Sequence, residues 1–339
     1  MKIREPAYYR SFHCLAGNCP DTCCQAWDIQ VDPNTAARYA AVSGPLGEAL
    51  RTHLHLEDGD TVITLGEDGV CPMLRRDGLC RIQADLGEEA LCQVCRDFPR
   101  LRHDYGDFLE LGLEMSCPEA ARILLTAPAG PDLLRDAPDS GEPDYDHEAM
   151  TVLTATRESA LSLLCDESRP LAETFALLFF YGCHVQALLD GEEAPAFDPE
   201  EALETARALT KPAELRPILD FFLELDILTD TWQNLLKGVH APALSPLCRN
   251  LAKYLVRRYW LQAVADYDLY CRVKFILISC ILVGSLGGDF IDTAHLWSKE
   301  IENDADNMDA ILDAAYESLI FTDDKILGLF LQNSQNPPL

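Results

Sequence analysis

The sequence predicts a mainly α-helical protein, in which a small cysteine-rich module of irregular or mixed α and β structure precedes an α-helical domain. Nine of the 14 cysteines lie in the first 117 residues, in sequence interrupted by glycine and proline. Residues 126–146 are rich in proline and acidic residues, and helical spacing of apolar residues dominates beyond them. Because 339 residues are many for one core, the predicted parts are a module (1–125), a linker or exposed loop (126–146) and a helical domain (147–339).

The composition restricts the partners. The net charge of −29 argues against nucleic acid and anionic membranes, and it is compatible with a basic partner such as an exposed lysine. The first residues, MKIREPAYYRSF, contain no apolar core of a secretory signal, so a cytoplasmic location is expected. The most apolar run, residues 273–286, is too short to span a bilayer and is predicted to be a buried central helix; no membrane insertion is expected.

The elements of the module are short. Alternation and β-branched residues predict strands at residues 27–31 and 61–65, and looser alternation allows a third at 107–115. Pro33 permits a helix at 34–41. Further short helices are predicted at 81–94, ending before Pro99, and at 118–126, which Ser116 can cap.

Ten helices are predicted in the C-terminal part, with short connections rich in Gly, Pro and Asp. Their expected ranges are 147–165, 171–189, 199–209, 213–225, 229–237, 246–264, 267–286, 293–303, 308–320 and 324–331.

The early cysteines have the chemistry of metal ligands. A reducing cytosol disfavours disulfides, and thiolates suit zinc and iron–sulfur clusters. The spacing includes C-x4-C-x3-C-C and one CxxC pair, and it does not decide between zinc and an iron–sulfur centre. The five later cysteines lie in apolar helical sequence, where a thiol packs as a small hydrophobic group. They are Cys165, Cys183, Cys248, Cys271 and Cys280.

Five separated blocks of the module resemble the flagellin lysine-N-methylase family, often named FliB. A wider set of metal-cluster proteins with a CxxxCxxCC-type pattern shares the cysteines. The blocks are F-x-C-x4-C-x-D-T-C-C-x2-W (12–27), C-P-x-L-x3-G-L-C-R-I-Q (71–83), L-G-E-E (86–89), C-R-x-F-P-R (95–100) and S-C-P-E-A-A-R (116–122).

The resemblance implies methyl transfer from S-adenosylmethionine to surface lysines of flagellin by a protein that carries a [4Fe–4S] cluster. Zinc remains the alternative metal. The CxxxCxxC pattern of radical enzymes is not met, because Ala26 stands where the third thiol is needed. By the same resemblance the candidate metal ligands are Cys14, Cys19, Cys23, Cys24, Cys71, Cys80, Cys95 and Cys117, with Cys92 less certain.

Polar methyl transfer would need a group that removes the lysine proton and a group that holds the cofactor. Arg96 and Arg100 could bind the cofactor carboxylate, or they could offset the charge of a thiolate cluster. No glycine-rich turn follows a predicted strand, so a Rossmann-type cofactor site is not expected. No spacing singles out one proton acceptor among Asp104, Tyr105, Glu110, Glu114 and Glu119.

Two other functions remain open from the residues. The module could be a structural metal site in a non-catalytic binding protein whose helical domain is the interaction surface. An electron-transfer protein is a weaker alternative, because the long helical part shows no second redox site. His13 and His103 lie near cysteines, but a lone histidine there is more often incidental.

Overall fold

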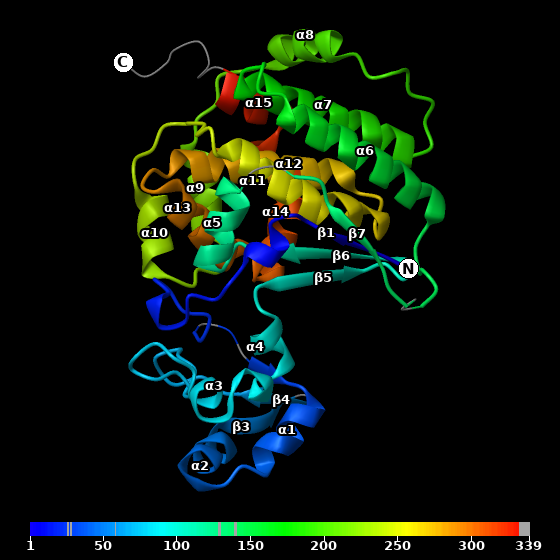
Figure 1. Cartoon of the computed structure of the whole chain (residues 1–339). Helices are drawn as coiled ribbons and strands as arrows, with labels where there is room; N and C mark the ends of the chain where they lie inside the picture. The colour runs from blue at the N-terminus through cyan, green and yellow to red at the C-terminus, as the bar shows by residue number, and fades with distance from the viewer. Residues whose placement is uncertain (26, 28, 58, 128–129, 139–140, 332–339) are drawn as a thin grey trace.

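The computed structural model describes residues 1–25, 27, 29–57, 59–127, 130–138 and 141–331. Helices predominate, so the mainly α fold class is confirmed. Figure 1 shows a large helical body with a small module below it. We call the segment from Cys19 to Asp97 the cysteine module. The remainder of the described chain is the helical body, to which β5, β6 and α5 belong although they precede residue 126.

The cysteine module is built on a three-stranded antiparallel sheet in the order β2-β4-β3. Ile29 pairs with Ile63 across the sheet, and both side chains are buried with Tyr39 and Leu50 in a core separate from that of the helical body. The Asp32 carboxylate accepts a hydrogen bond from the Thr35 amide and so caps the first helix. The elements are β2 (Ile29–Val31), α1 (Pro33–Ala40), α2 (Gly44–His53), β3 (Leu54–Glu57), β4 (Asp60–Ile63), α3 (Arg81–Leu86) and α4 (Gln93–Asp97).

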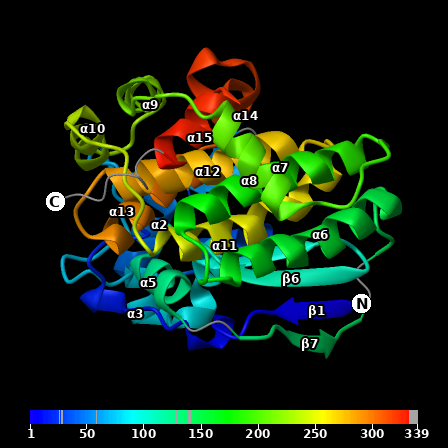
Figure 2. The same ribbon diagram turned by 90° about the horizontal axis from the view of Figure 1, so that it is seen from above.

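A second sheet, in the order β5-β6-β1-β7, lies under the helical body (Figures 1 and 2). The N-terminal strand β1 (Lys2–Glu5) runs parallel to β6 (Phe108–Leu113) and antiparallel to β7 (Leu133–Asp136). The outer strand β5 (Arg100–Asp104) pairs with β6. The cysteine module is therefore inserted between two strands of one sheet.

The helical body has one large core, and a smaller buried cluster that includes Phe12, Leu113 and Ile123 lies apart from it. Its helices are α5 (Pro118–Thr126), α6 (His147–Cys165), α7 (Leu171–Leu189), α8 (Pro199–Leu209), α9 (Arg216–Leu223), α10 (Asp230–Lys237), α11 (Cys248–Tyr259), α12 (Leu269–Ser285), α13 (Phe290–Trp297), α14 (Ala305–Glu317) and α15 (Asp323–Leu331). Six of these helices begin after a side chain that accepts backbone N–H groups, and in five of them this residue is an aspartate, which accounts for part of the acidity of the sequence. The caps are Asp146, Asp198, Thr229, Asp268, Asp289 and Asp304.

Helix α12 is the centre of this core and confirms the buried helix predicted at 273–286. It packs against α7, α11 and α14, and nearly all of its side chains are buried. By length and composition α7 is the one described helix that could cross a membrane, a candidate that the sequence analysis did not identify. In the structure α7 packs against α6, α8, α12 and α15, and about half of its residues are buried.

Several predicted elements differ from the structure. The helix predicted at 81–94 is wrong: α3 ends at Leu86, Gly87 adopts a φ of +90°, and α4 starts only after Cys92. Strands β1, β3 and β5 and helix α2 were not predicted, and β7 lies inside the segment expected to be a linker or loop. The domain boundaries remain predictions; residues 128–129, 139–140 and 332–339 of the expected linker and helical domain lie outside the described residues.

Leu282→Ala should lower the free energy of unfolding by about 2–5 kcal/mol, because its fully buried side chain in α12 leaves a cavity when truncated. The same change at Leu319, which is 78 % exposed, should cost less than about 0.5 kcal/mol. Denaturation by urea measures both values. Equal losses would contradict the central position of α12.

Candidate functional site

The thiols of the cysteine module converge in pairs. Cys92, at the N-terminal end of α4, is buried and forms a thiol–thiol hydrogen bond with Cys95, which lowers the pKa of Cys92. The hydrogen bond with Cys92 and burial raise the pKa of Cys95. A second pair, Cys23 and Cys24, forms the same kind of bond and lies close enough to Cys95 to add to this shift. The Cys23–Cys24 segment is joined to the chain at Cys71 by a hydrogen bond, which the Cys71 amide donates to the Cys24 carbonyl at 2.8 Å.

Two further thiols complete this first group. Burial raises the pKa of Cys71 to about 11, and the neighbouring Cys80 and Cys92 thiols act in the same direction. Burial raises the pKa of Cys80, and the neighbouring Cys23 thiol raises it further. Six thiols of the module, Cys23, Cys24, Cys71, Cys80, Cys92 and Cys95, thus form one electrostatically connected group.

A second group lies where the module meets the helical body. Cys117, just before α5, is buried, and its pKa is raised to about 11 by that burial. Cys14 and Cys19 lie close enough to contribute to this shift, and Cys23 in turn acts on Cys19. Cys14, Cys19 and Cys117 are therefore brought together, and Cys23 connects them to the first group.

These thiols match a soft metal in donor chemistry. Across the described residues, no group of three or more His, Cys, Asp or Glu side chains is arranged to hold a metal ion. The thiols thus have the chemistry of metal ligands, but they do not form a coordination sphere in the structure. Which cysteines bind a metal stays a prediction.

The predicted cofactor arginines lie at the junction of module and body. Arg100 starts β5, and its guanidinium lies over the Phe12 ring at 5.0 Å from the ring centre. Arg96 in α4 makes only a long ion pair of 4.0 Å with Asp97. The two side chains share no partner among the interactions that the structure shows, so their joint role also stays a prediction.

A π-helical turn, Ser298–Glu302, connects this junction to the core. The buried Lys299 ammonium binds Asp21 of the cysteine segment at 2.8 Å. The Glu302 carboxylate, with 0 % exposure, accepts hydrogen bonds from Tyr254 at 3.0 Å and Tyr259 at 2.7 Å. Arg258 forms an ion pair with the same carboxylate at 3.0 Å.

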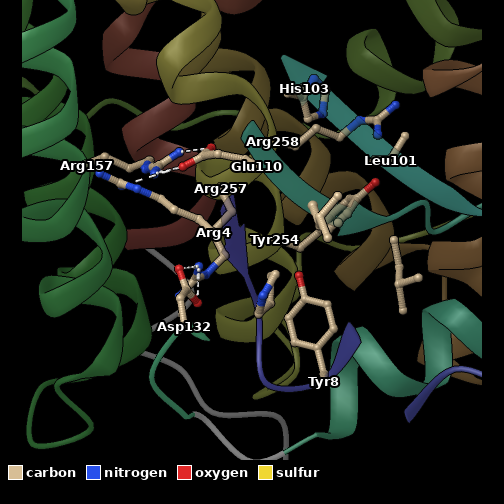
Figure 3. Close-up of a pocket in the computed structure, with 14 residues that line it drawn as sticks. Arg4, Tyr8, Leu101, His103, Glu110, Asp132, Arg157, Tyr254, Arg257 and Arg258 are labelled. Carbon is tan, nitrogen blue, oxygen red and sulfur yellow. Dashed lines mark hydrogen bonds and ion pairs between the residues drawn. The ribbon is translucent and has the colours of Figure 1, made fainter. Parts of the chain in front are cut away.

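The second sheet and the helices enclose a cavity of about 40 Å³ that is lined by arginines (Figure 3). On one side lie Leu101 and His103 of β5 and Glu110 of β6; since side chains alternate along a strand, Arg100 and Arg102 point away. We call this space the arginine cavity. Its lining is Arg4, Pro6, Tyr8, Leu101, His103, Glu110, Leu111, Gly112, Leu113, Asp132, Arg157, Tyr254, Arg257 and Arg258.

Ion pairs hold the guanidinium groups in place. Arg157, on α6, binds Glu110 through two hydrogen bonds of 2.7 and 2.6 Å. Arg257 binds Asp132 at 3.0 Å. Arg257 and Arg258 end α11, where a positive charge is favourable beside the helix dipole. The lining contains four arginines and two carboxylates.

Among the described residues, three buried nitrogen atoms at this cavity have no hydrogen-bond partner: His103 Nε2, Arg157 Nε and Arg258 Nη1. Burial lowers the pKa of His103, and the charge of Arg258 lowers it further. His103 is therefore expected to be neutral near pH 7 and to face an excess of positive charge.

A second hollow, of about 450 Å³, lies on the cysteine module beside α4. Three carboxylates line it, those of Asp32, Asp60 and Asp97, together with Gln30, Val31 and Thr61. We call it the acidic groove. Both carboxylate oxygens of Asp32 accept backbone N–H groups, from Thr35 and Gln93, and these bonds lower its pKa.

The structure separates the predicted proton acceptors. Glu110 lines the arginine cavity, whereas Glu114 is buried and accepts a hydrogen bond from Ser116 at 3.0 Å. Glu119 is paired with Arg122. Tyr105 stacks on Phe108, and Asp104 lies on the exposed face of β5.

The arginine cavity was not predicted from the sequence. One signal was available: Arg157 shares a face of α6 with Leu153, Ala160, Leu161 and Leu164, all buried. A charged residue at such a position needs a buried partner. The partner, Glu110, is distant in the sequence and could not be named from periodicity.

The chain is similar to three curated bacterial proteins. It is 32 % identical over 141 residues to a flagellar biosynthetic protein FliU of Salmonella muenchen, and the match covers 38 % of this chain and 79 % of that protein. The chain belongs to the lysine-N-methylase (FliB) family.

Two further members of the family are named lysine-N-methylase. The proteins of Salmonella choleraesuis and Salmonella typhimurium are 33 % and 32 % identical over 141 residues. Each match covers 38 % of this chain and spans about a third, 33 %, of the relative. No family model and no solved structure matches the chain.

In this FliB-family protein, the His103 imidazole should titrate below the reference pKa of about 6.5. The unfolded chain then binds the proton more readily, so stability is lost as the pH falls from about 7 through the lower folded pKa. NMR titration, with the signal assigned by its loss in His103→Gln, measures the pKa. The variant should also lack this part of the pH dependence, and a pKa at or above 6.5 would contradict the buried neutral imidazole.

Proposed function

We propose that the chain is a cytoplasmic, S-adenosylmethionine-dependent methyltransferase that modifies lysine side chains of flagellin. Membership of the lysine-N-methylase family carries this proposal, through the relative of which 79 % is covered. The names of the relatives support it in two ways: two are lysine-N-methylases, and the third is a flagellar biosynthetic protein.

The acidic groove supports a lysine substrate. Its volume of about 450 Å³ can admit an extended lysine side chain, and three carboxylates attract the ammonium group. The hydrogen bonds to Asp32 keep its carboxylate ionised near neutral pH. Asp60 and Asp97 face the same space and are the candidates to accept a proton from the bound lysine.

The chemistry requires that proton transfer. A lysine with a pKa of about 10.4 is protonated at neutral pH and has no free electron pair. After the proton leaves, the nitrogen forms a bond to the methyl carbon while the bond from carbon to the sulfonium sulfur breaks. The products are a methylated amine and a neutral thioether, so no external oxidant or reductant is needed.

The cofactor site is proposed at the junction of module and body. Arg100, oriented by its position over Phe12, and Arg96 can bind the carboxylate of S-adenosylmethionine. Four of the thiols of Cys14, Cys19, Cys23, Cys24, Cys71, Cys80, Cys95 and Cys117 would hold the metal centre, with a [4Fe–4S] cluster first and zinc second. When bound, such a centre would fix the loops of the module and, in the case of the cluster, supply an electron-transfer site.

A second function is favoured by one observation, the separate core of the cysteine module. A metal site could stabilise this small unit without taking part in a reaction. The chain would then be a non-catalytic binding protein. Methyl transfer by the purified protein distinguishes the two functions.

The purified protein, with S-adenosylmethionine and flagellin, should produce methyl-lysine, detected by mass spectrometry. Replacing the groove carboxylates in Asp60→Asn/Asp97→Asn should raise the KM for flagellin at least about threefold, because two exposed charge interactions are lost. The same double variant should lower kcat, because both candidate proton acceptors are removed. Asp309→Asn removes an exposed carboxylate from α14, away from the groove, and should change neither KM nor kcat.

No methyl transfer to a flagellin that carries unmodified lysines, by protein with its metal bound, would overturn the proposed activity. Activity with an unchanged KM in the double variant would keep the activity and reject the acidic groove as the lysine site.

Protein purified without oxygen should contain either iron with acid-labile sulfide or zinc. Cys71→Ser should lower the metal content, because Cys71 is buried within the first thiol group. Cys165→Ser, at an exposed position on α6, should retain it. Elemental analysis and the visible spectrum measure the outcome, and equal metal content in both variants would exclude Cys71 as a ligand.

A further inference from the structure

We infer that the arginine cavity binds a small oxyanion, either the carboxylate of an amino-acid-like molecule or inorganic phosphate. This inference is independent of the proposed methyl transfer, because it rests on residues of the second sheet, α6 and α11 and uses neither the thiols nor the acidic groove.

The local charge is opposite to that of the whole protein. The chain carries a net charge of −29, yet four guanidinium groups and two carboxylates line this cavity. Glu110 is already paired with Arg157 and, at 3.6 Å, with Arg4, and Asp132 is paired with Arg257. Arg258 is paired with Glu302, which is not part of the lining. Four guanidinium groups thus face three carboxylates, which leaves an excess of one positive charge. A cation would meet the excess positive charge, whereas an anion would balance it.

Hydrogen-bond donors are available in the cavity. Arg157 is 3 % exposed, and its Nε atom has no partner although both terminal nitrogens bind Glu110. Arg258 forms an ion pair with Glu302, and no described residue forms a hydrogen bond with its Nη1 atom. A buried guanidinium N–H without an acceptor is costly, and an oxyanion supplies acceptors in the geometry that arginine prefers.

His103 adds to the lining of the arginine cavity a ring that can act as a donor or an acceptor of hydrogen bonds. Its Nε2 atom is buried without a partner, and the neutral ring can donate from either nitrogen. Figure 3 shows His103, Arg258 and Arg157 around the space, with Arg4 and Arg257 also at its edge. The donors come from β1, β5, α6 and α11, so the fold itself assembles them.

Size and access limit the ligand. A volume of about 40 Å³ corresponds to a few water molecules, which suits a carboxylate or a phosphate group and excludes a complete nucleoside cofactor. Arg4 and Arg257 are about one-third exposed, at 28 % and 33 %, so the ligand can enter past side chains that lie at the surface.

The test uses the full chain at low salt in a buffer without competing anions. Inorganic phosphate and L-methionine are titrated separately, and binding is followed by calorimetry and by the His103 NMR signal. Arg4→Gln should raise the Kd at least about tenfold by removing a charge at the cavity. Arg102→Gln is the matched control, because it removes the same charge from the opposite face of β5 and should leave the Kd unchanged.

His103→Gln is the second variant, for the case that Arg4→Gln does not fold. It should fold normally, because the substitution breaks no hydrogen bond to the histidine Nε2 atom among the described residues. It should weaken binding while circular dichroism and the unfolding midpoint are retained. Saturable binding of phosphate alone would assign free phosphate, and binding of methionine alone would assign an amino-acid carboxylate. Absence of saturable binding for both probes, or equal weakening by Arg4→Gln and Arg102→Gln, would overturn the inference.

Discussion

The buried charges of the π-helical turn Ser298–Glu302 hold three parts of the molecule in register. Lys299 binds Asp21 of the cysteine segment, Glu300 accepts hydrogen bonds from Leu228 and Thr229 before α10, and Glu302 binds the end of α11. Side chains of a wide turn project differently from those of an α-helix, which allows neighbouring residues to reach separate partners. Because an unpaired buried charge is far more costly than a paired one, each of these contacts favours one arrangement.

The same turn supports the arginine cavity and the region where the two thiol groups meet. Through Glu302 it positions Arg258, which forms part of the arginine cavity. Through Asp21 it restrains the chain between Cys19 and Cys23, where the two thiol groups meet. His295, one helical turn earlier, also approaches Asp21 at 3.4 Å. Thus the position of the first cysteines depends on the core of the helical body as well as on the cysteine module.

Helical periodicity identified the strongest elements of the fold. Helix α12 is apolar on all sides, as a central helix requires, and α5 has the predicted bounds because Pro118 sets its first turn and the chain extends after Thr126. Strands β1 and β7, with sequences KIRE and LLRD, have no clear apolar alternation; their pairing arises from partners that are distant in the sequence. The cysteine groups could be predicted as ligand-type residues, but not their pairing in space. The arginine cavity was inaccessible to sequence reasoning because its walls extend from Arg4 to Arg258.

The place of β1 in the sheet has a consequence during synthesis. Its parallel partner begins at Phe108 and its other neighbour at Leu133, so β1 leaves the ribosome long before either strand exists. At about 5–20 residues per second, the delay is on the order of 5–20 seconds. Lys2, Arg4 and Glu5 keep the waiting strand charged, which discourages pairing with other nascent chains. The cysteine module emerges completely within this interval, so it can form its own sheet and core before the sheet beside it closes.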